Sequence, residues 1–99
     1  MIEIQHSNDE KRGSFKASSD GNPAGLMTYT WAGEDRFIID HTEVEAAYNG
    51  KGVGKEMLMA AVDFARKNNK AIIPLCPFAK ATFQKHEELQ DVLVNKTQA

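Results

Sequence analysis

The amino-acid sequence predicts an α+β (mixed α/β) fold, in which a mostly antiparallel five-stranded sheet carries one main helix on one face. Before residue 45, short segments of alternating polarity are separated by turn-forming residues. Strands that are joined by such turns pair antiparallel. A helical pattern and one more apolar run follow, and a strand–helix–strand order implies a parallel pair with a right-handed crossover.

The four N-terminal strands are recognised by residues that alternate between polar and apolar. They are expected around Ile2 and Ile4, and over residues 13–18, 24–31 and 36–44. The run Ser19–Pro23 is a turn, because Gly and Asn accept a positive φ and Pro fixes its own. Ala32–Asp35 is the loop of the next hairpin.

Helical spacing begins at residue 53. Apolar residues recur every three or four positions, as an amphipathic helix requires: Val53, Met57, Leu58, Ala61, Phe64 and Ala65. The helix is expected over 53–67, ending at two asparagines that tolerate a left-handed backbone. A strand over 71–75 follows, then a short C-terminal helix that begins with Pro77 and continues to Lys85, and one or two further turns over 87–93.

Size and composition are those of one soluble domain, assigned to residues 1–94, with a frayed tail over 95–99. The chain is 41% hydrophobic and 26% charged, with a net charge of −2, so it offers no basic field for nucleic acid. No apolar run is long enough for a membrane span, and no coiled-coil pattern suggests an oligomer, so a monomer is the default expectation. One cysteine fits the reducing cytoplasm. Three scattered histidines and that cysteine do not form a metal-ligand pattern.

The segment 49–55, Asn-Gly-Lys-Gly-Val-Gly-Lys, carries the strongest functional signal. It connects an apolar strand to the main helix. Glycines let the backbone approach a ligand, and the free N–H groups at a helix start attract negative charge. The segment therefore predicts a site for a phosphorylated ligand.

Two common phosphate motifs do not fit this segment. A P-loop requires a glycine where Asn49 stands and a Ser or Thr where Glu56 stands. The dinucleotide fingerprint G-x-G-x-x-G fails from either Gly50 or Gly52. An ordinary turn at a helix start remains the alternative to a binding loop.

The segment resembles the Q/R-x-x-G-x-G/A loop of the GCN5-related N-acetyltransferases (GNAT), with Asn49 in place of Gln or Arg. Two further motifs resemble a small subfamily of about this length: H-T-x-V at residues 41–44 and P-x-C-P/S at 74–77. The resemblance implies that acetyl-CoA is bound without a metal. It assigns the pyrophosphate and upper pantetheine to eight residues: Val44, Asn49, Gly50, Lys51, Gly52, Val53, Gly54 and Lys55. Phe78 and Phe83 would pack beside the pantetheine arm.

Cys76 is the first candidate for chemistry. It precedes an expected helix, where the helix dipole favours a thiolate, and the resemblance places the acyl group near it. Cys76 then either accepts the acetyl group or lines the acyl pocket as a small buried hydrophobe.

His41 and Glu43 are the second candidates. In a regular strand both would share a face with Ile39, while residues 40, 42 and 44 would take the other face. His41 would accept a proton from an amine or from Cys76, and Glu43 is an alternative base or a partner that orients His41. The alternative is a histidine that only hydrogen-bonds within the sheet.

The expected function is transfer of an acetyl group from acetyl-CoA to an amine of unknown identity, directly or through Cys76. Larger relatives often carry a tyrosine on the helix after the fifth strand, as an acid for the departing CoA thiol. This chain has Phe78 and Phe83 there, and no tyrosine after Tyr48. The competing hypothesis is therefore a module or sensor that binds CoA or acyl-CoA without turnover.

Overall fold

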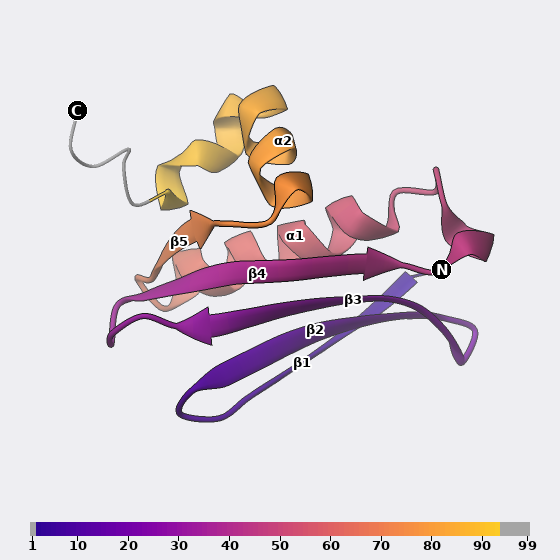
Figure 1. The fold of residues 1–99 in the computed structure, drawn as a ribbon, viewed down its shortest axis with the longest axis horizontal. Helices are drawn as coiled ribbons and strands as arrows, with labels where there is room; N and C mark the ends of the chain where they lie inside the picture. Colours follow the sequence, from indigo (N-terminus) through magenta and orange to yellow (C-terminus); the bar gives the residue numbers. More distant parts are fainter. Residues whose placement is uncertain (1, 94–99) are drawn as a thin grey trace.

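The computed structural model describes residues 2–93, which form one five-stranded sheet in the order β1-β2-β3-β4-β5 (Figure 1). The first four strands pair antiparallel, and β4 and β5 pair parallel. The strands are β1 (Ile2–Asn8), β2 (Arg12–Ser19), β3 (Asn22–Trp31), β4 (Arg36–Val44) and β5 (Ala71–Pro74). The predicted fold class is confirmed. The tail expected over 95–99 lies outside the described residues.

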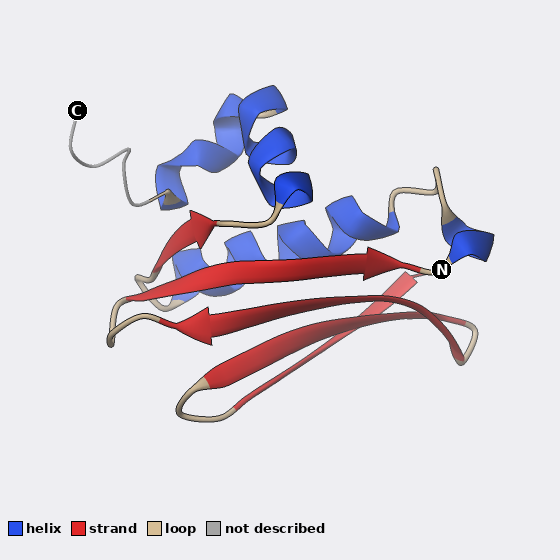
Figure 2. Cartoon of the chain, in the orientation of Figure 1, coloured by secondary structure: helices blue, strands red, loops and turns tan. Residues whose placement is uncertain are grey.

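Two α-helices and two short 3-10 helices complete the fold. They are η1 (Ala46–Tyr48), α1 (Val53–Lys67), α2 (Pro77–Lys85) and η2 (Glu87–Val92). Figure 2 shows α1 along one face of the sheet, where it contacts all five strands, with α2 and η2 beyond the β5 edge. None of the helices within residues 2–93 is long and apolar enough to cross a membrane.

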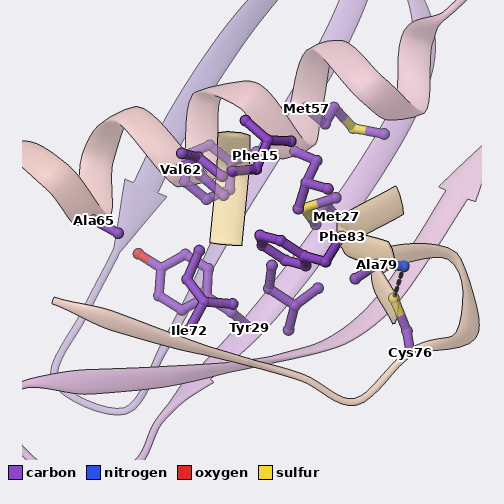
Figure 3. Close-up of a cluster of buried hydrophobic side chains, with 14 of the residues drawn as sticks. Phe15, Met27, Tyr29, Met57, Val62, Ala65, Ile72, Cys76, Ala79 and Phe83 are labelled. Carbon is purple, nitrogen blue, oxygen red and sulfur yellow. Dashed lines mark hydrogen bonds between the residues drawn. The ribbon is translucent and has the colours of Figure 1, made fainter. Parts of the chain in front are cut away.

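The core lies between α1 and the sheet. Its largest side chains, Phe15, Tyr29 and Phe37, come from three different strands and are at most 1% exposed. From α1, the buried stripe is Val53, Gly54, Met57, Leu58, Ala61, Val62 and Ala65. Figure 3 shows this cluster continuing to Phe83 and Cys76, so α2 belongs to the same core.

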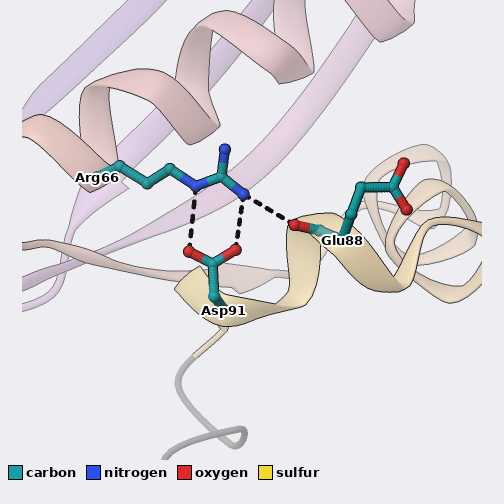
Figure 4. A network of polar contacts seen from close by, with 3 residues as sticks. All are labelled: Arg66, Glu88 and Asp91. Atoms are coloured by element: carbon teal, nitrogen blue, oxygen red, sulfur yellow. Dashed lines mark hydrogen bonds and ion pairs between the residues drawn. The ribbon is translucent and has the colours of Figure 1, made fainter.

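A bidentate ion pair fastens η2 to the end of α1 (Figure 4). The Arg66 guanidinium donates to both carboxylate oxygens of Asp91, at 2.7 and 3.1 Å, and to the Glu88 carbonyl at 2.8 Å. The hydrogen bond from Arg66 lowers the pKa of Asp91 against the opposing effect of partial burial.

Strand β4 contains a bulge that the sequence analysis missed. Thr28 pairs with His41, but the next residue of β3, Tyr29, pairs with Ile39, so Asp40 is an extra residue. A bulge reverses the alternation of side chains beyond it. The prediction that His41 shares a face with Ile39 is therefore wrong: Ile39 is buried in the core, whereas His41 is exposed.

Candidate functional site

The glycine loop, residues 49–55, runs from the end of η1 into the first turn of α1 and has the backbone that the glycines predict. Gly50 and Gly52 have φ values of 78° and 82°, a region that L side chains rarely adopt. A Cβ built on either glycine would have no neighbour within 4 Å. The backbone conformation therefore requires glycine there, and the loop borders open space.

The start of α1 has no side-chain cap. The N-cap residue is Gly52, at the position where Ser, Thr, Asp or Asn usually binds the first free amides of a helix. Within residues 2–93, no acceptor bonds the main-chain amides of Gly50, Gly52 or residues 53–55. The Lys51 amide is occupied, because it donates to the Tyr48 carbonyl at 3.2 Å. Five amides thus lack an internal acceptor, two of them on the buried residues Val53 and Gly54.

Positive charge lies on both sides of these amides. Lys51 and Lys55 are exposed, and the Lys51 Nζ lies 6.0 Å from the centre of the Tyr48 ring. Glu56, one residue further along the first turn of α1, is the only acidic residue of that turn. Free amides at the positive end of the helix dipole, with two lysines beside them, favour an anion.

Phe78 connects the loop to α2. A Cβ built on Gly54 would lie 2.6 Å from the Cζ atom of Phe78, so the ring rests directly on the glycine backbone. Phe78 is 37% exposed, one of two large exposed hydrophobic residues in the described chain. Phe83, further along α2, is 2% exposed and belongs to the core.

Strands β4 and β5 part beside Cys76. Their pairing ends at Ile39 and Pro74, although β4 continues to Val44. The Ile39 carbonyl accepts the amides of both Leu75 and Cys76, at 3.0 and 3.1 Å. This forked hydrogen bond marks the point where the chain leaves β5 and turns into α2.

Cys76 is the N-cap residue of α2, as predicted from Pro77, and it is 6% exposed. Its sulfur accepts a hydrogen bond from the Ala79 amide at 3.4 Å (Figure 3). The Thr42 hydroxyl lies 3.3 Å from the same sulfur. The sulfur therefore has one partner on α2 and one on β4.

His41 and Glu43 form a separate pair on the other face of β4. Their side chains are 59% and 67% exposed, and His41 Nε2 lies 3.2 Å from Glu43 Oε1. The predicted proximity of these two residues is confirmed. In the part of the chain that the structure describes, no hydrogen bond joins His41 to Cys76, and Thr42 holds that position instead.

Asp40 fixes the bulge that produces this arrangement. Its carboxylate accepts the hydroxyls of Thr28 and Thr30 at 2.6 and 2.7 Å. Partial burial opposes ionisation of Asp40, but these hydrogen bonds outweigh it and hold the pKa of the carboxyl below its ordinary value. A Thr-x-Thr pair on β3 opposite an aspartate on β4 was the only sequence signal for the bulge.

The start of α1, with its unbonded amides, therefore lies in a sheet-and-helix fold whose last two strands part beyond Ile39 and Pro74. The sequence model of the GCN5-related N-acetyl-transferase family matches residues 14–92, and the chain belongs to that family. No group of His, Cys, Asp or Glu side chains within residues 2–93 is arranged to hold a metal ion.

Individual relatives agree with this assignment. Protein NATD1 of Gallus gallus is 36% identical over 64 residues, which are 64% of this chain and 56% of the relative, so the match spans just over half of that protein. A GCN5-like chain from Staphylococcus aureus, solved by NMR, is 34% identical with a TM-score of 0.68, covering 91% of this chain and 87% of that one. AAC(6')-Iy, solved with a bisubstrate analogue containing CoA, shares the fold at 15% identity, with a TM-score of 0.58 over 82% of this chain and 62% of that one.

Proposed function

We propose that this chain binds acetyl-CoA through the glycine loop and transfers its acetyl group to an amine, directly or through Cys76. The observation that carries the proposal is the set of unbonded amides at Gly50, Gly52 and residues 53–55. Amides at a helix start that lack an internal acceptor are suited to a diphosphate. Family membership and the CoA-containing complex of AAC(6')-Iy support the same ligand.

Each predicted binding residue has a part in this proposal. The loop amides hold the diphosphate, with Lys51 and Lys55 adding charge, while Asn49 and Val44 border the loop and the end of β4. Phe78, exposed beside Gly54, contacts the pantetheine arm. Phe83 supports it from the core.

Bound acetyl-CoA would supply an activated thioester, and the residues of this chain would hold and receive the acetyl group. In the covalent route, the Cys76 thiolate forms a bond to the carbonyl carbon as the carbon–sulfur bond to CoA breaks. CoA leaves as a thiolate and takes a proton from water. An amine then attacks the acetylated cysteine, and its surplus proton passes through water to His41 or Glu43 on the other face of β4, so the Cys76 thiolate is restored.

In the direct route, the amine forms a bond to the thioester carbonyl carbon as the carbon–sulfur bond to CoA breaks. CoA leaves as a thiolate that takes a proton from water, and Cys76 lines the acyl pocket. His41 or Glu43 again receives the proton of the amine, which would approach from their exposed face of β4. Both routes gain rate by holding thioester and amine side by side. The amine is a small molecule or an exposed amine of a protein or peptide.

A second candidate function, binding CoA or acyl-CoA without turnover, is favoured by the composition of α2. This helix has no tyrosine to protonate the departing CoA thiolate. Such a module would use the same loop, so it differs from the enzyme only in the chemistry at Cys76.

Two glycine variants test the binding site. Gly52 and Gly33 both have positive φ, and a Cβ on either would meet nothing within 4 Å, so Gly52→Ala and Gly33→Ala should each strain the backbone without a steric clash. Only Gly52 belongs to the loop. We expect CoA to shift the amide NMR signals of residues 50–55, and Gly52→Ala to weaken binding by about tenfold or more while Gly33→Ala leaves it unchanged. Unshifted loop amides at saturating CoA would refute the proposed site.

Intact-mass measurement after incubation with acetyl-CoA separates the two candidate functions. An acetyl adduct that is absent from Cys76→Ala supports the covalent route. CoA release in the presence of amines, without an adduct, supports direct transfer. Binding with neither adduct nor release supports the module without turnover.

A further inference from the structure

The buried sulfur of Cys76 has a hydroxyl partner that belongs to a different element. Thr42 Oγ1 lies 3.3 Å from Sγ, and Cys76 is only 6% exposed. We propose that Thr42 is a positioning residue for Cys76, whose hydroxyl orients the thiol and stabilises it when ionised. The inference deepens the proposed covalent route and rests on it.

A hydroxyl is suited to both protonation states of the sulfur. It accepts a hydrogen bond from S–H in the thiol, and it donates its own hydrogen to the thiolate. The Ala79 amide, 3.4 Å from Sγ, can only donate. The ionised sulfur would therefore receive two hydrogen bonds, which a buried anion needs because water reaches it poorly.

The bulge at Asp40 is what directs Thr42 toward this sulfur. Before the bulge, Phe37 and Ile39 face the core, so uninterrupted alternation would have turned His41 inward and Thr42 outward. The extra residue reverses this pattern. The hydrogen bonds from Thr28 and Thr30 to Asp40 hold the bulge in place.

No charged side chain in the described chain competes with Thr42 for the sulfur. On β4, His41 and Glu43 are exposed and paired with each other, and Asp40 is exposed and bonded to the two threonines. On α2, the Lys80 side chain is exposed. The main-chain amide of Lys80 donates to the Cys76 carbonyl, not to the sulfur. The hydroxyl and the Ala79 amide are thus the two groups bonded to Sγ.

Two variants of Thr42 test the role. Thr42→Val keeps the shape and removes the hydroxyl, whereas Thr42→Ser keeps the hydroxyl. Because the chain has one cysteine, alkylation by iodoacetamide, followed by intact mass from about pH 5 to about pH 10, reports on Cys76 alone. We expect Thr42→Val to slow alkylation about tenfold at about pH 7, and Thr42→Ser to stay within about twofold of wild type.

The plateau rate at high pH is the control for access and folding. If Thr42→Val lowers the rate equally at every pH, its effect is on exposure of the thiol, and the inference is overturned. The inference is also overturned if Thr42→Val keeps the wild-type dependence of the alkylation rate on pH, or if Thr42→Ser alkylates as slowly as Thr42→Val.

The acetyl adduct distinguishes this inference from the proposed function. If wild type forms no adduct with acetyl-CoA while alkylation still depends on the Thr42 hydroxyl, the covalent route fails and the positioning of the thiol stands. If the adduct forms equally fast in wild type and in Thr42→Val, with equal CoA binding, the function stands and the role of Thr42 is refuted.

Discussion

One methyl group would be accommodated very differently at two glycines of this chain. A Cβ on Gly13 would lie 2.1 Å from Cζ of Tyr29, and one on Gly54 would lie 2.6 Å from Cζ of Phe78. Tyr29 is fully buried, and its hydroxyl is bonded to His6 at 2.6 Å, whereas Phe78 is 37% exposed. Only the second ring has solvent into which it can turn.

Alanine at each position measures this difference. We expect Gly13→Ala to lower the free energy of unfolding by about 1–3 kcal/mol, because the buried ring and the backbone must shift together. Gly54→Ala should leave the free energy of unfolding nearly unchanged. The cost of displacing Phe78 is offset by the better helix propensity of alanine, worth about 1 kcal/mol. Urea unfolding measures the free energy of unfolding of both variants. Equal losses of that free energy would show that burial of the facing ring does not determine how well a methyl group is tolerated.

At the scale of elements, local pattern was enough to place the helices and most strands. Val53–Lys67 and Arg36–Val44 have the predicted bounds, because each has a clear period and a clear terminator. Strand β3 begins at Asn22 rather than Ala24, because Asn22 and Pro23 still pair with β2 beside a register shift. The free amides were predictable too, since a glycine N-cap carries no side chain to bond them.

The bulge in β4 was not predictable in the same way. It depends on three polar side chains from two strands, and the sequence of β4 alone gives no reason to interrupt its alternation. The missed bulge led to the wrong face for His41, and it concealed Thr42 as the partner of Cys76. The glycine loop is a local feature of the chain, but the surroundings of the thiol are set by contacts between distant segments.

The attachment of η2 to α1 gives a prediction with a defined pH dependence. Asp91→Asn should lower the free energy of unfolding by about 0.5–1 kcal/mol at about pH 7, since the pair with Arg66 is bidentate but partly exposed. The hydrogen bond from Arg66 lowers the pKa of Asp91, so its stabilisation is present above the unfolded value of about 4 and is lost as pH falls through the folded value. The difference between wild type and variant should therefore vanish at about pH 2.

Asp35→Asn is the matched control for this measurement. It removes the same charge from an exposed pair with Arg36, whose single contact is 3.4 Å long. If Asp35→Asn lowers the free energy of unfolding as much as Asp91→Asn does, the change in net charge, and not the bidentate geometry, accounts for the effect.

On the scale of the whole molecule, the candidate site and the aromatic core meet on β4 but otherwise use different parts of the fold. The site uses the end of β4, the start of α1 and the start of α2. The aromatic cluster joins the first four strands and α1, with Phe37 as its member from β4. At its β1 end, the His6 ring stacks on Phe15 at 4.2 Å and meets the edge of Phe64 at 4.5 Å. Strand β1 is an edge strand, so these contacts help to attach it to the rest of the protein.

His6 should make the stability of the whole fold depend on pH. Burial lowers the pKa of His6, so the folded protein favours the neutral ring, while the unfolded chain takes up the proton more readily. The stabilisation is complete above the unfolded value of about 6.5, and it falls as pH is lowered toward the folded value.

His6→Gln keeps a hydrogen-bonding group near Tyr29 and removes the titration. Urea unfolding at about pH 7.5 and about pH 5.5 should therefore show a larger loss of stability for wild type than for the variant. Equal losses would assign the pH dependence to other groups.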